Sequence, residues 1–169
     1  LRDYASTRIN SRIMDERRCV PPSVMLDFGN HGLMGMQVPE AFGGLGLRYA
    51  DALRGLEQLA AIDLTLAAIV FLNGTNGIRP IQYHATTAIR DAWLPRLAAG
   101  RQLASFALSE PIAGSNVGGV SAHAIPDGRG GWRIRGVKRW NSSAWAGIVS
   151  VFVRMTDETG RLGGLTGFA

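Results

Sequence analysis

The sequence predicts an α+β fold in which an all-helical domain comes first and a β domain follows it. In the first hundred residues, apolar side chains recur at helical spacing in segments that are separated by helix-breaking proline and glycine residues. From Gln102 onward, the apolar residues occur in short runs separated by turn signals. Because the helices precede the strands instead of alternating with them, we expect two joined domains, covering residues 1–101 and 102–169.

Five helices are expected in the first domain, each bounded by residues that favour a helix end. Asp63 is a candidate N-cap for the apolar fourth helix, and Gly74 and Gly77 are expected to end that helix. Thr86 is expected to lie near the start of the fifth helix, and Gly100 follows its end. The expected ranges are about 4–17, 21–30, 49–62, 64–72 and 86–98.

The second domain is expected to contain short strands joined by tight turns. The clearest signal is the segment Pro126–Gly131, which is rich in Gly and Asp and lies between two apolar runs, as in a hairpin. The expected strands are 103–108, 120–125, 132–137, 149–155 and 163–169.

Composition and charge exclude several classes of function. The formal net charge is +5, but the basic residues are scattered, whereas a nucleic-acid surface has a denser basic stripe with aromatic residues between the charges. No apolar run approaches the ~20 residues that span a bilayer. The single cysteine, Cys19, allows no internal disulfide and fits a cytoplasmic location. No metal site is expected, because three histidines lie far apart in the sequence: His31, His84 and His123.

Two segments have the residue types of a lining for a planar, polar-edged heterocycle. The first, from Phe106 to Asn116, begins as a strand and ends as a loop with hydroxyl groups and a glycine. A strand end leaves backbone N–H and C=O groups that need partners, and serine side chains add donors and acceptors. In the second segment, Trp140 is followed by three small polar residues, Asn141, Ser142 and Ser143. Taken alone, each segment also fits an ordinary loop.

In order and spacing, these segments resemble the acyl-CoA dehydrogenase family. The run Phe106-Ala-Leu-Ser-Glu-Pro-Ile-Ala-Gly-Ser-Asn116 is similar to the family motif F-A-L-T-E-P-G-A-G-S-D, and Gly136-Val-Lys-Arg-Trp-Asn-Ser142 is similar to G-x-K-x-W-I-T/S. Upstream, residues 32–46 resemble the block G-L-x-G-x-x-V-P-E-x-x-G-G-x-G, and residues 93–100 resemble W-L-P-x-L-A-x-G. Four matches in the same order cover nearly the whole chain.

The resemblance implies an N-terminal helical domain and part of an antiparallel, β-barrel-like middle domain, with the family's C-terminal four-helix domain missing from this chain. It also implies FAD as cofactor, and α,β-dehydrogenation of an acyl thioester carried by CoA or by a carrier protein. No catalytic base is expected in this chain, because the family's glutamate lies in the missing domain, and Glu110 matches a structural glutamate of the motif. The implied partners are an electron-transfer flavoprotein or similar acceptor and further copies of the chain, in a homodimer or homotetramer.

The same resemblance assigns a role to each site residue. Phe106 and Leu108 are expected along the flavin, Ser109 at the pyrimidine side of its ring, and Gly114 and Ser115 where cofactor phosphate and substrate approach each other. Trp140 is expected to pack on the ring, and Asn141 and Ser142 to lie near its redox-active nitrogen. The expected cofactor-binding residues are therefore Phe106, Leu108, Ser109, Gly114, Ser115, Trp140, Asn141 and Ser142, with Ser115 also at the substrate.

Several residues depart from the family pattern and keep other functions open. Ser109 replaces Thr and keeps the hydroxyl, whereas Ile112 and Asn116 replace Gly and Asp. Asn141 stands where Ile is usual, which places a polar amide beside the expected flavin. One alternative is therefore a monooxygenase of the same fold, in which reduced flavin activates O₂. A second, non-enzymatic alternative is a truncated scaffold or partner subunit, because both chain ends suggest a fragment of a longer protein.

Overall fold

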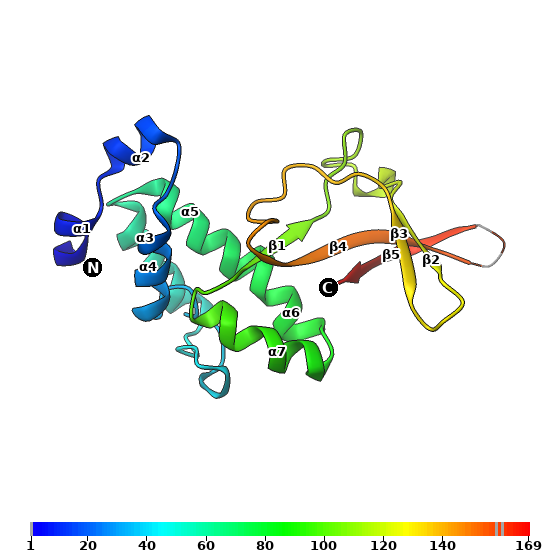
Figure 1. Ribbon diagram of the computed structural model, residues 1–169, viewed down its shortest axis with the longest axis horizontal. Coiled ribbons are helices and arrows are strands. Elements are labelled where there is room, and N and C mark those ends of the chain that lie inside the picture. The colour runs from blue at the N-terminus through cyan, green and yellow to red at the C-terminus, as the bar shows by residue number, and fades with distance from the viewer. Residues whose placement is uncertain (1, 158, 160) are drawn as a thin grey trace. The chain divides into compact units, whose positions relative to one another are not determined.

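The protein consists of a helical unit and a β unit, which divide between Leu103 and Ala104. The computed structural model describes residues 2–157, 159 and 161–169 (Figure 1). The predicted order of helices before strands is confirmed, and so is the α+β class. The seven described α-helices are α1 (Arg2–Arg8), α2 (Ser11–Arg17), α3 (Pro22–Asn30), α4 (Tyr49–Ala60), α5 (Leu64–Leu72), α6 (Arg79–His84) and α7 (Thr87–Ala98).

The prediction of one helix over residues 4–17 is wrong, because the chain forms α1 and α2 with a break at Asn10. The backbone of Asn10 has φ −125° and ψ 88°, outside the helical region, and its side chain accepts a hydrogen bond from the Ile13 amide. Asn is among the residues that cap helices best, and its side chain competes with the backbone for such bonds. The N-caps expected for α5 and α7 are present, since Asp63 and Thr86 accept hydrogen bonds from the Leu66 and Ile89 amides.

The predicted range of the fourth helix, 64–72, is confirmed by α5, but Gly74 and Gly77 do not end the helical path of the chain. The chain continues from α5 through a π-helical segment, η2 (Asn73–Ile78), directly into α6. Asn73 and Ile78 are almost fully buried, with 3% and 1% of their surface exposed. A glycine costs a helix only about 1 kcal/mol, so burial of the neighbouring side chains is enough to keep the segment helical.

The glycine-rich segment 43–46 of the helical unit makes a close backbone contact with residues 35–38. After the short 3₁₀ helix η1 (Glu40–Phe42), the amides of Leu45 and Leu47 donate to the carbonyls of Gly35 and Met36. A Cβ atom at Gly44 would lie 2.0 Å from the carbonyl oxygen of Val38. Only glycine fits at position 44, so packing explains this residue.

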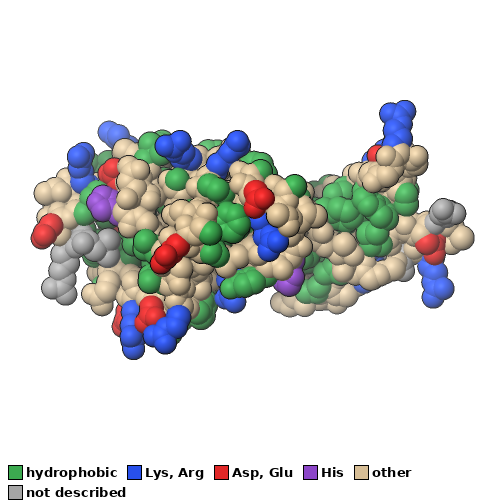
Figure 2. Space-filling model, turned by 90° about the horizontal axis from the view of Figure 1, so that it is seen from below, with side chains coloured by type: hydrophobic (Ala, Val, Ile, Leu, Met, Phe, Trp, Pro, Cys, Tyr) green, Lys and Arg blue, Asp and Glu red, His purple; other side chains and the backbone are tan. Residues whose placement is uncertain are grey.

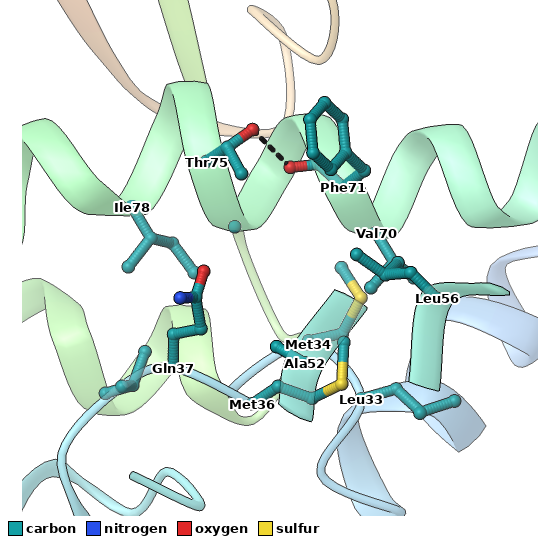
Figure 3. Close-up of a pocket in the computed structure, with 12 residues that line it drawn as sticks. Leu33, Met34, Met36, Gln37, Ala52, Leu56, Val70, Phe71, Thr75 and Ile78 are labelled. Atoms are coloured by element: carbon teal, nitrogen blue, oxygen red, sulfur yellow. Dashed lines mark hydrogen bonds between the residues drawn. The ribbon is translucent and has the colours of Figure 1, made fainter. Parts of the chain in front are cut away.

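A small apolar pocket of the helical unit, shown in Figure 3, lies between the segment 33–38 and the helices α4, α5 and η2. Its volume of about 20 Å³ is roughly what one water molecule requires. Most of its lining is apolar, with Gln37 and Thr75 as polar exceptions, and the Thr75 hydroxyl donates to the Phe71 carbonyl. The pocket is therefore a packing defect of the helical core and not a site for an organic ligand.

The strands of the β unit form a sheet in the order β1-β4-β2-β3, with β5 also paired to β4. The pairs β2–β3 and β4–β5 are antiparallel, as expected of hairpins, whereas β2 and β4 are parallel. The core of this unit centres on Ala122, Ala124 and Val153. The strands are β1 (Leu103–Ala107), β2 (His123–Pro126), β3 (Trp132–Arg135), β4 (Gly147–Thr156) and β5 (Leu162–Phe168).

The second and third strands are each two residues shorter than predicted, and each has a local cause. The second strand begins at His123 and not at Val120, because the Ser121 and Ala122 amides donate to the carboxylate of Glu110 instead of a strand partner. The third strand ends at Arg135 because Gly136 has φ +144°, outside the extended region, and its position admits no Cβ beside Ala122.

Candidate functional site

The end of β1 presents two half-buried apolar side chains on one face. Ser105 and Ala107 are buried, whereas Phe106 and Leu108 are half-buried, which is the alternation expected where one face of a strand is covered. The Phe106 ring packs against the Phe152 ring of β4, with 4.5 Å between the ring centroids. β4 therefore fixes the orientation of the first predicted site residue.

After β1, the chain makes a tight turn that leaves its outer residues open to solvent. The Glu110 amide donates to the Ala113 carbonyl at 2.8 Å, and the Ala113 amide donates back to Glu110. Gly114 and Ser115 follow as exposed residues, and no atom lies within 4 Å of a Cβ placed on Gly114. Internal packing does not require this glycine, so the space beside it is available to a ligand.

The second predicted segment is attached directly to the first. The Arg139 amide donates to the Ser109 carbonyl at 2.9 Å, and the Lys138 ammonium donates to the Leu108 carbonyl at 2.9 Å. Trp140 comes next, with 87% of its surface exposed and a left-handed backbone at φ +62°. A bulky residue in that conformation is uncommon, and backbone strain of this kind concentrates at functional sites.

A buried ion pair lies at the junction of these two segments, where residues 108–110 meet residues 138–139. Glu110 and Lys138 are 2.8 Å apart, and only 2% and 10% of their side chains are exposed. The Glu110 carboxylate also accepts hydrogen bonds from the Ser121 amide, the Ser121 hydroxyl and the Ala122 amide, at 2.7–2.9 Å. Burial opposes ionisation of Glu110, but the bonds from Lys138, Ser121 and Ala122 outweigh it and lower the pKa to about 2.

These contacts decide what Glu110 does. A carboxylate that stays ionised at neutral pH and already accepts four hydrogen bonds has neither the basicity nor the access that a general base needs. Glu110 is thus a structural residue, in agreement with its place in the sequence motif. Ser121 has no sequence signal for its part in this network, because it lies 11 residues from Glu110 in a segment expected to be a strand.

Arg154 of β4, which no sequence motif indicated, supports the loop that follows Ser115. Its guanidinium donates to the carbonyl oxygens of Val120, Gly118 and Gly163, which ties the short helix η3 (Val117–Gly119) to β4 and β5. The loop after Ser115 is therefore held by hydrogen bonds, although most of its side chains are exposed.

The site also contains polar side chains without internal partners. Among the residues that the structure describes, the hydroxyls of Ser109, Ser115 and Ser142 and the Asn141 amide make no intramolecular hydrogen bond. Together with the exposed Trp140 ring, they can pair with the polar edge of a planar heteroaromatic ligand while the indole covers its face. The residues present fit a flavin. Ser109 and Trp140 lie at the same junction, whereas Gly114 and Ser115 lie beyond the turn.

Neither the charges on the face drawn in Figure 2 nor the metal-ligating side chains of the described residues indicate a second candidate site. On the face that Figure 2 shows, Lys and Arg side chains occupy separate places rather than one stripe. Within the described part of the chain, no group of three or more His, Cys, Asp or Glu side chains could hold a metal ion. No described helix combines the length and the apolar character that crossing a membrane requires.

Comparison with known proteins agrees with the motifs over both units. Residues 1–101 match the family described as acyl-CoA dehydrogenase, N-terminal domain, and residues 105–169 match acyl-CoA dehydrogenase, middle domain. The human mitochondrial short-chain specific acyl-CoA dehydrogenase is 29% identical over 92% of this chain and 37% of its own length. An acyl-CoA dehydrogenase of Bacillus subtilis is 29% identical over 96% of this chain and 44% of its own length.

Solved structures agree with the fold. A glutaryl-CoA dehydrogenase from Mycobacterium smegmatis, in complex with FADH2, superposes with a TM-score of 0.87 at 28% identity, covering 99% of this chain and 42% of that chain. An acyl-CoA dehydrogenase from Bacillus anthracis, complexed with FAD, has a TM-score of 0.77 at 26% identity, covering 87% of this chain and 25% of that chain. This chain spans less than half the length of these proteins. Over both of its units, it belongs to the acyl-CoA dehydrogenase family.

Proposed function

We propose that this chain forms one side of a FAD site in an enzyme that dehydrogenates an acyl thioester between Cα and Cβ. The observation that carries the proposal is the junction at Ser109, where an exposed, left-handed Trp140 and unpartnered polar side chains meet at the end of β1. The M. smegmatis and B. anthracis relatives, solved with FADH2 and FAD, support the cofactor. When bound, FAD supplies the hydride acceptor of the reaction.

Each site residue has a role in binding and orientation. Phe106 and Leu108 provide an apolar surface along the ring, and Trp140 covers its face. The hydroxyls of Ser109 and Ser142 and the amide of Asn141 offer hydrogen bonds to its polar edge. Beyond the turn, Gly114 and Ser115 leave room for cofactor phosphate and for the substrate, to which Ser115 offers its hydroxyl.

The catalytic base is proposed to lie outside residues 1–169, in the C-terminal domain that the family resemblance implies. Glu110, a carboxylate at the junction, supports this proposal, because it is held ionised and its oxygens already accept four hydrogen bonds. The residues of this chain therefore bind and orient, and the α-proton leaves to a group supplied elsewhere.

CoA is the proposed carrier of the acyl group, and an acyl-carrier protein is the second candidate because the chain is basic, with a net charge of +5. An electron-transfer flavoprotein or a similar acceptor is the proposed oxidant of the reduced enzyme. The proposed assembly is a homodimer or homotetramer in the cytoplasm, where the free, exposed thiol of Cys19 would persist.

A monooxygenase of the same fold is a second candidate, favoured by one residue. Asn141 places a half-buried amide without an internal partner next to Trp140, where the family motif has an apolar side chain. A polar group at this position is suited to a flavin that reacts with O₂.

Anaerobic titration of the full chain with acyl-CoA thioesters tests the proposal. We expect the flavin absorbance to bleach with at least one thioester, while reduced flavin consumes O₂ slowly. Rapid O₂ consumption with no bleaching by any thioester supports the monooxygenase instead. A full chain that binds no FAD contradicts both and leaves the scaffold role.

A matched pair of variants tests the site. Trp140→Ala is expected to weaken FAD binding about tenfold, the effect of losing one aromatic stacking contact. Trp145→Ala is the control, because Trp145 lies in the same loop with 90% of its surface exposed but outside the proposed site. Equal effects of the two changes on FAD affinity would remove Trp140 from the proposal.

A further inference from the structure

The contacts around Ser109 form a continuous hydrogen-bonded junction between two segments of the chain. Lys138 bonds to the Leu108 carbonyl and to the Glu110 carboxylate, and the next residue, Arg139, bonds to the Ser109 carbonyl. Three consecutive residues of one segment are thus held by two consecutive residues of the other. The backbone bond from Arg139 to Ser109 fixes the register of the segments as well as their distance, because a shift by one residue breaks it.

The junction is also fixed at its base. The Glu110 carboxylate is held by the amides of Ser121 and Ala122, which belong to a third segment. On the same side, Gly136 is pressed against Ala122 so closely that an added Cβ would lie 2.4 Å from the Ala122 Cβ. The 136–139 segment therefore contacts a fixed surface just before the chain reaches Trp140.

Trp140 needs such a support. Its side chain is 87% exposed and its backbone is left-handed at φ +62°, so packing of its own ring does not hold it in that conformation. A strained backbone persists only where the surroundings determine it. On its N-terminal side, the chain is held by the bonds of Arg139, one residue earlier, and of Lys138, two residues earlier.

We propose that Glu110 and Lys138 are positioning residues, which hold Ser109 and Trp140 in the cofactor-binding arrangement before the cofactor arrives. The proposal rests on the FAD site proposed above and adds to it the groups that preorganise that site. Stability alone does not account for the pair, since buried ion pairs can often be replaced by apolar side chains without loss of stability. A defined register between two segments is what a buried, fully hydrogen-bonded pair provides and an apolar contact does not.

The double variant Glu110→Gln/Lys138→Met tests this in the full chain, because it removes both charges and leaves neither buried alone. In the absence of flavin, amide hydrogen exchange at Arg139 reports directly on the bond to Ser109. We expect that exchange to accelerate at least tenfold, while amides of β4 keep their protection. FAD affinity is expected to fall about tenfold, with a shifted visible spectrum of the flavin that still binds.

Val153→Ala is the control, since Val153 is fully buried in β4 and lies outside the junction. It is expected to lower protection across the sheet with no selective effect at Arg139. Ser121→Ala is a milder variant that removes one hydroxyl bond to Glu110, and it is expected to accelerate Arg139 exchange a few-fold even if the double variant does not fold.

Two results would overturn the proposal: Arg139 exchange that stays unchanged in these variants, or protection that falls equally at Arg139 and in β4. The second result assigns the pair a purely structural role. The exchange experiment contains no flavin, so it decides the positioning role even if the wild-type full chain fails to bind FAD. That failure would contradict the proposed function alone.

Discussion

Glu110 makes the stability of the β unit depend on pH in a direction that its contacts determine. The pKa of its carboxyl is lowered from 4.5 to about 2 in the folded protein, where Lys138, Ser121 and Ala122 stabilise the ionised form against burial. Because the folded pKa lies below the unfolded one, the ionised carboxylate stabilises the fold. This contribution is fully present above about pH 5 and is lost as the pH falls toward 2.

The size of the effect follows from the two pKa values. At about 1.4 kcal/mol for each pH unit, the difference between 4.5 and about 2 corresponds to ~3 kcal/mol. By linkage, about 2 kcal/mol of this is lost on going from pH 7 to pH 3. Hydrogen bonds from the Arg129 and Gly131 amides also lower the pKa of Asp127, so Asp127 too loses stabilising free energy as the pH falls. This contribution does not depend on residue 110, so it cancels when wild type is compared with a Glu110 variant.

Urea unfolding followed by tryptophan fluorescence, at pH 7 and pH 3, measures this contribution in wild type and in Glu110→Gln. Glu110→Gln is expected to be less stable at pH 7, because Lys138 loses the partner of its charge. Between pH 7 and pH 3, it should lose about 2 kcal/mol less stability than wild type does. If the free-energy difference between the two proteins is the same at both pH values, the account of the ionised Glu110 is refuted.

Five further variants, at four positions, test the helical unit by urea unfolding. Asp63→Ala removes the N-cap of α5 and should cost about 1 kcal/mol, whereas Asp63→Asn should cost much less. Leu94→Ala, at a fully buried position of α7, should cost ~2–5 kcal/mol, and a loss below 1 kcal/mol would contradict its place in the core. Gly44→Ala forces a Cβ against the Val38 carbonyl and should cost more than Gly43→Ala, which meets only the left-handed backbone penalty of about 1–2 kcal/mol.

Local signals in the sequence predicted most of the secondary structure. The caps at Asp63 and Thr86 depend on neighbours three residues away, so the sequence pattern contains them. The π-helical passage through Gly74 could not be predicted, because burial against other segments decides it. The parallel pairing of β2 with β4 was missed for the same reason, since it joins strands about thirty residues apart.

For the candidate site, the motifs indicated the residues but not the contacts that join them. Ser109 and Trp140 were both named from the resemblance, and the bond from the Arg139 amide to the Ser109 carbonyl brings their segments together. Nothing local connects Glu110 with Lys138, 28 residues later, or with the amide of Ser121. Such contacts follow from tertiary packing, and only the structure reveals them.

The most direct test of the central claim is the flavin content of the purified full chain. We expect a yellow protein that releases FAD on denaturation at one FAD per chain, with binding weakened by Trp140→Ala but not by Trp145→Ala. A colourless full chain whose fluorescence and visible spectrum do not change on titration with FAD would contradict it.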